Sequence, residues 1–273
     1  MNVPFSRPVL EEFGRIVIEE ERRRERALQS NYGYYDNEGV RQGGLIAFVR
    51  HFWSVLEPSR EFVDGWPIWA MCEHLEAVTR GDIRRLLINV PPGFCKSLLT
   101  DCFWPAWEWG ARGLLHYRYT CFSYSQALTV RDNTRFRDLL SSKIFRKLYP
   151  NVHLRNETVI KVMNSDTGWK YASSIVGVTM GERGDRVIID DPHNIQEVES
   201  EVERANVTNW FRTGVPSRLN DLDTGAIVVI MQRLHEDDVS GIALGKDFDY
   251  EHRNQRQSDT ARCAVLACRC CGG

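Results

Sequence analysis

The chain has 273 residues, of which 42% are hydrophobic and 26% charged, and its formal net charge is −2. These values are ordinary for a globular protein and argue against disorder across the whole chain. The length suffices for one large domain, or for a domain with a small appendage. The near-neutral total excludes the overall basic excess of many DNA-binding proteins, although it leaves room for a local basic stripe.

No apolar run approaches the roughly 20 residues that a membrane span needs, and the first residues lack the apolar core of a signal peptide. Four of the eight cysteines, at positions 72, 95, 102 and 121, show no paired spacing. Such cysteines are typical of reduced thiols in an intracellular protein. We therefore expect a soluble protein that does not associate with a membrane.

Residues 1–60 are expected to form an N-terminal helical segment and linker. In the run EEERRRER the opposite charges fall at helical separations of three and four residues, which predicts a solvent-exposed helix over residues 9–29. An alternative is that its arginines contact phosphate or a neighbouring subunit. Residues 31–44 are rich in glycine and tyrosine and are interpreted as a linker before a second helix at 45–56.

Strands alternate with helices in residues 61–250, which predicts an α/β domain with a mostly parallel central sheet flanked by helices. Buried strands are expected at residues 86–90, 117–124, 186–189 and 226–231, helices at 97–109 and 129–148, and a hairpin from 159–163 to 169–173. This domain contains nearly all of the motifs that suggest chemistry.

The last stretch, residues 251–273, begins polar and without periodicity and contains the other four cysteines near its end. No histidine lies among these cysteines, and their spacing matches no strong zinc pattern. We therefore favour an aberrant or disordered C-terminal tail, produced by a truncated or frame-altered end, over a metal-binding segment.

The segment from Pro91 to Ser97 lies between a predicted strand and a predicted helix, where backbone N–H groups and the helix dipole favour an anion. A lysine at this place, Lys96, supplies charge to the β- and γ-phosphates of a nucleotide, and the hydroxyl of Ser97 can bind Mg²⁺. The residues expected to contact the nucleotide are Pro92, Gly93, Phe94, Cys95, Lys96, Ser97 and Leu98.

This loop departs twice from the pattern G-x-x-x-x-G-K-[ST], because Val90 and Cys95 replace its two glycines. Taken alone, the segment also fits a plain strand-to-helix turn with a surface lysine. A cysteine fits the second glycine position if its backbone φ is negative.

A second motif follows 94 residues after Lys96, where the apolar run of residues 187–189 ends in Asp190 and Asp191. Beside a phosphate loop, Asp190 would hold Mg²⁺, and Asp191 would orient or deprotonate the attacking water. The alternative is ordinary turn or helix-start chemistry before Pro192. The order and element types of the two motifs together indicate a P-loop ATPase that uses ATP and Mg²⁺.

A third apolar strand ends in Gln232 and Arg233. Because ligands of parallel sheets lie beyond the carboxyl ends of the strands, these side chains are expected to face the same crevice as Lys96 and Asp190. This position suits a γ-phosphate sensor that couples hydrolysis to motion. The alternative is a strand end followed by a helix with acidic first-turn residues.

These motifs resemble the ATPase domain of the large terminase subunit of tailed bacteriophages, the motor that packs DNA into proheads. The resemblance is carried by LLINVPPGFCKS at residues 86–97, by residues 123–140, by GERGDRVIIDDP at 181–192, and by residues 210–241. It implies an ASCE-like P-loop NTPase that couples ATP hydrolysis to translocation of double-stranded DNA. The implied partners are DNA, the portal protein, the small terminase subunit and further copies in a ring, in the cytoplasm of the bacterial host and outside the mature virion.

Carried over to this sequence, the resemblance assigns Lys96 and Ser97 to phosphate and Mg²⁺, and Asp190 to the metal. Asp191 stands where these motors usually place a catalytic glutamate, and Gln232 and Arg233 belong to the coupling motif. Residues 66–71 match, more weakly, a segment that contacts adenine. The family's nuclease domain is missing from this chain, so no endonuclease activity is expected.

The arginines are less well defined. Pro91 and Pro92 occupy the place where several family members carry an arginine finger. The alternatives for a finger, acting within the chain or on a neighbour, are Arg183, Arg212 and Arg218. Possible contacts to DNA phosphates are Arg131, Arg135 and Arg137 on the helix predicted at 129–148, although we favour a solvated helix face as their explanation.

Two other functions remain open from the sequence. One is a different DNA-dependent P-loop enzyme such as a helicase, although no second motor domain is visible. The other is a catalytically inactive fragment that only docks to portal or small terminase subunits, which the departures at Val90 and Cys95 would explain.

Overall fold

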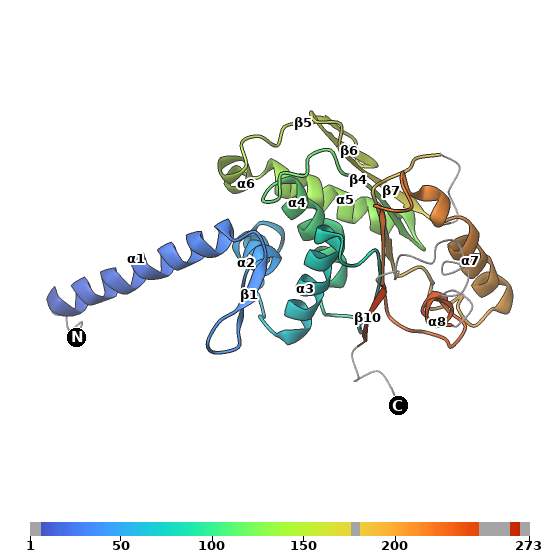
Figure 1. The fold of residues 1–273 in the computed structure, drawn as a ribbon, viewed down its shortest axis with the longest axis horizontal. Coiled ribbons are helices and arrows are strands. Elements are labelled where there is room, and N and C mark those ends of the chain that lie inside the picture. Colours follow the sequence, from blue (N-terminus) through green and yellow to red (C-terminus); the bar gives the residue numbers. More distant parts are fainter. Residues whose placement is uncertain (1–6, 176–180, 246–262, 268–273) are drawn as a thin grey trace.

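The computed structural model describes residues 7–175, 181–245 and 263–267 (Figure 1). Its centre is an eight-stranded sheet. The strands are β3 (Arg85–Asn89), β4 (Arg118–Ser123), β5 (Leu154–Glu157), β6 (Lys161–Asn164), β7 (Trp169–Ser174), β8 (Arg186–Asp190), β9 (Ala226–Met231) and β10 (Cys263–Ala267). All the expected strands are present, and β6 and β7 form the expected antiparallel hairpin.

The strand order is β10-β3-β9-β8-β4-β7-β6-β5. Pairings from β10 to β7 are parallel, and the pairings of β6 with β7 and with β5, at one edge, are antiparallel. The α/β fold with a mostly parallel sheet is therefore confirmed. Strand β9 lies between β3, which leads into the predicted phosphate loop, and β8, which ends in the acidic pair. An additional strand at this place defines the ASCE-like arrangement.

Helices cover both faces of the sheet (Figure 1). The helices are α1 (Arg7–Gln29), α2 (Gly44–Leu56), α3 (Trp66–Arg80), a π-helix η1 (Leu98–Phe103), α4 (Trp104–Trp109), α5 (Gln126–Ser141), α6 (Lys143–Leu148), α7 (Glu201–Thr213), a 3₁₀-helix η2 (Pro216–Arg218) and α8 (Val239–Leu244). None of the helices in the described part of the chain is long and apolar enough to cross a membrane.

Alternate residues of the central strands enter two separate apolar cores. Leu86 and Ile88 of β3 pack with residues of α2 to α6 on one face, whereas Leu87 packs with residues of α7 and α8 on the other. Since successive strand residues point to opposite faces, a strand buried on both sides must be apolar throughout. This explains the unbroken apolar run of β9, in which all six residues are buried.

The helix after the predicted phosphate loop is irregular where a single α-helix was predicted. The N–H of Trp104 bonds to the carbonyl of Leu99, five residues earlier, as in a π-helix. Pro105 follows, and it has no N–H to continue the α-helical ladder. Asp101 and Cys102 of this π-helix are both buried in the core.

The helix predicted over residues 129–148 is divided into α5 and α6. Ser142 between them is extended, and its hydroxyl accepts a hydrogen bond from the N–H of Phe145. A serine in this conformation caps a new helix instead of continuing the previous one. The predicted residues are helical, but the direction of the chain changes at Ser142.

The N-terminal segment is held to the domain by a buried glutamate. Helix α1 projects from the body (Figure 1), and residues 15–26 on it are exposed, as expected for a solvated helix. The segment interpreted as a linker contains a hairpin of β1 (Gly33–Tyr35) and β2 (Arg41–Gly43). The carboxylate of Glu76, in α3, accepts hydrogen bonds at 2.8 Å from Gly33 N, Leu45 N and Arg41 Nη2. These contacts stabilise the segment against the domain because they give the buried guanidinium of Arg41 a carboxylate partner.

Most of the expected C-terminal tail lies outside the described residues. Within it, residues 263–267 form β10, which pairs in parallel with β3 and places Ala267 opposite Asn89. The division of the chain into residues 1–60, 61–250 and 251–273 stays a prediction.

We predict that Glu76→Ala destabilises the protein by about 3–5 kcal/mol, because it leaves the buried guanidinium of Arg41 and two N–H groups without their acceptor. Glu73 provides the matched control: it lies on the same helix and contacts the same arginine, at 3.6 Å, but its side chain is 47% exposed. Glu73→Ala should cost about 1 kcal/mol or less. Equal losses in the two variants by denaturant unfolding would contradict this account.

Candidate nucleotide-binding site

The loop after β3 turns sharply before the next helix begins at Lys96. Gly93 and Cys95 both have left-handed backbones, with φ of 92° and 54°. The carbonyl of Cys95 accepts the first helical hydrogen bond, from Leu99 N at 3.0 Å. The condition under which a cysteine was expected to fit, a negative φ, is therefore not met. The position requires the conformation that glycine adopts without strain.

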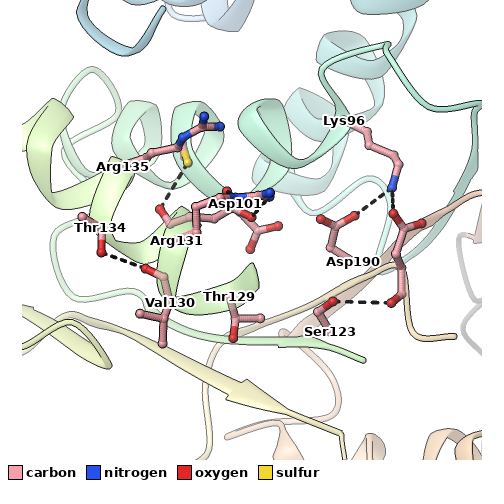
Figure 2. Close-up of polar contacts among 12 residues, drawn as sticks. Lys96, Asp101, Ser123, Thr129, Val130, Arg131, Thr134, Arg135 and Asp190 are labelled. Carbon is pink, nitrogen blue, oxygen red and sulfur yellow. Dashed lines mark hydrogen bonds and ion pairs between the residues drawn. The ribbon is translucent and has the colours of Figure 1, made fainter. Parts of the chain in front are cut away.

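Lys96 joins the loop to the acidic strand end across 94 residues of sequence. Its Nζ lies 3.3 Å from Asp190 Oδ1 and also pairs with Asp191 Oδ2 (Figure 2). The residue is only 7% exposed. A surface lysine on a plain turn does not have this environment, so the structure brings the two predicted motifs together.

The second aspartate is held by the ends of two neighbouring strands. Asp191 has a φ of 43°, and its N–H donates to Ile230 O at 3.0 Å. Its carbonyl accepts hydrogen bonds from Tyr124 N at 3.2 Å and from the hydroxyl of Ser123 at 3.4 Å. The turned backbone is thus fixed by β4 and β9, and it directs the carboxylate towards Lys96.

The two residues at the end of β9 are placed differently from each other. The backbone N–H of Gln232 donates to Asp191 Oδ1 at 3.0 Å, which brings this strand end into the site. The guanidinium of Arg233 is exposed and donates to Glu236 O at 3.5 Å, within its own loop. Among the residues that the structure describes, no contact joins Arg233 to Lys96 or to either aspartate.

Burial controls the charge of Asp190. It raises the pKa of this carboxyl to about 7, assisted by Asp101 and Asp191, whereas Lys96 and a hydrogen bond with Ser97 act in the opposite direction. A carboxylate that is costly to ionise in the protein gains strongly from a nearby cation. The Ser97 hydroxyl and the Asp190 carboxylate are hard oxygen donors of the type that Mg²⁺ prefers, so these residues fit the expected metal.

A buried charged cluster that the sequence reasoning missed lies behind the site. Asp101 of η1, Asp132 of α5 and Lys170 of β7 are all 3% exposed or less. Burial raises the pKa of Asp101 to about 6, although Lys170 lowers it. In the sequence these residues look like ordinary helix or strand charges, because only the packing of three distant elements brings them together.

A second missed group joins the strand ends to α8. The Nε2 of His193 accepts a hydrogen bond from Val239 N at 3.0 Å, and burial lowers the pKa of this imidazole, which favours the neutral, accepting form. Asn89 at the end of β3 donates to the Ser240 hydroxyl at 2.7 Å. Asp238 caps the helix through Gly241 N at 2.9 Å. The start of α8 therefore contacts both the phosphate-loop strand and the acidic loop.

The weaker match at residues 66–71 borders an apolar pocket beside the loop. Its lining includes Ile68 of α3, Trp53 of α2, and Phe94 and Cys95 of the loop. The pocket is too small for an aromatic base without movement of its side chains, so an adenine contact at residues 66–71 stays a prediction.

Two of the three arginines considered as fingers lie at the opposite end of β8 from Asp190. Arg183 lies three residues before β8 and is exposed, at the opposite end of that strand from Asp190. The carbonyl of Arg218 accepts a hydrogen bond from Gly184 N at 2.9 Å, which places it near the same edge. Arg212 is exposed on α7. A finger role for Arg183 or Arg218 therefore requires a neighbouring chain.

No family model matches the sequence, and no curated protein matches it. Among solved structures, the fold is similar to that of the HK97 bacteriophage large terminase, with a TM-score of 0.53 and 12% identity over 82% of this chain and 43% of that chain. This chain thus spans less than half of that protein. The resemblance to a large terminase is thereby confirmed at the level of the fold.

Two further matches have TM-scores below 0.5, and the fold comparison does not depend on them. The Thermus phage P74-26 large terminase ATPase domain matches with a TM-score of 0.49 and 11% identity, over 80% of this chain and 84% of that chain. The N-terminal domain of the DNA packaging ATPase from bacteriophage phi29 matches with 0.42 and 11% identity, over 71% and 94%.

We predict that Cys95→Gly is more stable than Cys95→Ala by about 0.5–1 kcal/mol. A left-handed backbone costs a non-glycine residue about 1–2 kcal/mol, which exceeds the roughly 0.5–1 kcal/mol that glycine loses through its flexibility when unfolded. Neither variant keeps the sulfur, so the difference isolates the backbone. Denaturant unfolding of both checks it, and a more stable alanine variant would show that the strain is absent.

The raised pKa of Asp190 predicts a pH dependence of stability. Between about pH 4, the ordinary value for Asp, and about pH 7 the unfolded chain is ionised here while the folded chain keeps the proton. The folded state binds more protons, so Asp190 lowers stability as pH rises through this window. Without divalent metal, Asp190→Asn should be more stable than the parent near pH 7.5, by a margin that shrinks by at most about 1.4 kcal/mol per pH unit towards pH 4. Denaturant unfolding of both proteins from pH 4 to pH 7.5 measures this difference in stability. A difference that does not change with pH would contradict a raised pKa at Asp190.

Proposed function

We propose that this chain is the ATPase motor of a bacteriophage terminase large subunit, which couples ATP hydrolysis to translocation of double-stranded DNA into proheads. One observation carries the proposal: Lys96 Nζ at the loop pairs with both Asp190, at 3.3 Å, and Asp191, and Asp191 also binds the end of β9 through Gln232 N. Three strand ends therefore meet at one buried lysine, in the order and on the element types of a P-loop ATPase.

In the proposed site, Lys96 and the backbone N–H groups of residues 92–98 stabilise the charge of the β- and γ-phosphates. The Ser97 hydroxyl and the Asp190 carboxylate hold Mg²⁺, which neutralises charge on the phosphates. For this binding mode, Lys96 must exchange at least part of its pairing with the aspartates for the phosphates.

Asp191 is proposed to orient the attacking water. Its two oxygens are bound by Lys96 and by Gln232 N, so a shift of Lys96 towards phosphate frees one of them. The other oxygen continues to hold β9. Loss of the γ-phosphate is then transmitted through Gln232 and Arg233 to the loop before α8, as proposed for the coupling motif.

The proposed partners are duplex DNA, the portal protein, the small terminase subunit and further copies of the chain in a ring, in the cytoplasm of the host and outside the mature virion. Arg183 and Arg218 suit a ring, because each lies too far from its own chain's Lys96 to act there. The chain spans 43% of the HK97 protein, so any activity of the remaining part of such a protein lies outside this proposal.

The test is hydrolysis of Mg²⁺–ATP by the purified chain, with and without duplex DNA. We expect Lys96→Ala to lower the rate by about 100-fold or more, because it removes a donor to the phosphates from a preorganised site. Lys147→Ala is the control, since Lys147 is an exposed lysine on α6.

Equal hydrolysis rates in the parent and Lys96→Ala proteins would contradict the proposed ATPase activity and favour a catalytically inactive docking module. Unwinding of DNA strands without movement along intact duplex would favour a helicase-like motor instead.

A further inference from the structure

Arg131 on α5 is anchored to a buried carboxylate. Its Nε donates to Asp132 Oδ1 at 2.9 Å and its Nη2 to Asp132 Oδ2 at 2.8 Å, in a two-pronged ion pair. The Asp132 side chain is 3% exposed, whereas that of Arg131 is 46% exposed. A buried carboxylate therefore fixes the orientation of a guanidinium that a ligand can still approach.

The fold places this guanidinium beside the candidate site. Helix α5 begins three residues after Ser123, whose hydroxyl bonds to the backbone of Asp191. The Asp132 carbonyl accepts a hydrogen bond from Cys102 Sγ at 3.3 Å, which fixes this part of α5 to η1, the helix that follows Ser97. Arg131 interacts electrostatically with Asp190, and Figure 2 shows it in the region of Asp101 and Asp190.

The remaining hydrogen-bonding capacity of Arg131 suits an oxyanion. A guanidinium has five N–H donors, and Asp132 uses two of them in the hydrogen bonds above. In the described part of the chain no other acceptor for Arg131 is recorded. Phosphate oxygens match the planar geometry of the remaining donors and the charge of the group.

We propose that Arg131 binds the γ-phosphate of the nucleotide from within the same chain and so distinguishes ATP from ADP. This inference rests on the proposed ATPase function and replaces the DNA contact expected for Arg131 from the sequence. Asp132 acts as a positioning residue because it fixes the orientation of the Arg131 guanidinium before the nucleotide binds. This reduces the side-chain entropy that Arg131 loses on binding.

The same helix supplies a matched control. Arg137 is also followed by an aspartate and pairs with it, at 3.2 Å. The carboxylate of Asp138, however, is 57% exposed, and neither residue is recorded in contact with the site in the described part of the chain. Arg137→Ala therefore removes an equal charge from α5 without removing a residue from the site.

The experiment measures the affinities of a non-hydrolysable ATP analogue and of ADP, both with Mg²⁺, by equilibrium fluorescence. We expect Arg131→Ala to weaken analogue binding by about 10- to 100-fold, as for loss of a charge-assisted hydrogen bond, and ADP binding by about twofold or less. Arg137→Ala should leave both affinities unchanged. Arg131→Lys keeps a positive charge beside Asp132 but loses the planar, two-donor geometry of the guanidinium. Its affinity for the analogue should lie between those of the parent and of Arg131→Ala.

The outcomes separate the two proposals. If the parent chain binds neither nucleotide, the proposed function fails. If it prefers the analogue over ADP and this preference is unchanged in Arg131→Ala and Arg131→Lys, the ATPase stands and the role of Arg131 is overturned. If Arg131→Ala instead weakens binding of duplex DNA and leaves the nucleotide preference unchanged, Arg131 contacts DNA and not the γ-phosphate. Should Arg131→Ala fail to fold, Arg131→Lys, which keeps the pair with Asp132, decides the question.

Discussion

The pairing of Lys96 with Asp190 and Asp191 is the interaction on which the site depends. A buried ammonium group and two carboxylates are each costly to remove from water, and they are stable here because they lie together. The burial that raises the pKa of Asp190 also makes the group responsive to any competing cation or anion. The three charged side chains of the site therefore have partners among themselves.

Other buried charges in the structure follow the same rule, with different consequences. Glu108 accepts hydrogen bonds from Tyr119 at 2.6 Å and Thr79 at 2.8 Å and lies 3.3 Å from Arg186, inside the larger core. The Glu108 side chain is fully buried among these partners, which suits a structural role. Asp132 differs, because its partner Arg131 is half exposed. Arg131 therefore differs from Arg186, whose guanidinium is buried together with its carboxylate partner.

The left-handed residues and the start of α8 show how the site is connected to the rest of the fold. Cys95 and Asp191 have positive φ on opposite sides of Lys96, so both loops are tightly turned where they meet it. His193 and Asn89 then join these loops to α8 by buried hydrogen bonds. A movement of either loop must therefore be accommodated by the same helix.

The sequence by itself determined the strands, the order of the motifs and the placement of Lys96 and Asp190 at one edge of the sheet, because apolar runs and polar strand ends are local signals. The direct pairing of these two side chains came from the tertiary structure. The sequence did not determine that Ser142 would divide one predicted helix, that φ at Cys95 would be positive, or that Arg233 would turn away from Lys96. The cluster of Asp101, Asp132 and Lys170, and the position of Arg131 beside it, were decided only by the tertiary structure. Their environment is created by elements far apart in the chain, and no local pattern records which distant carboxylate will be buried beside which arginine.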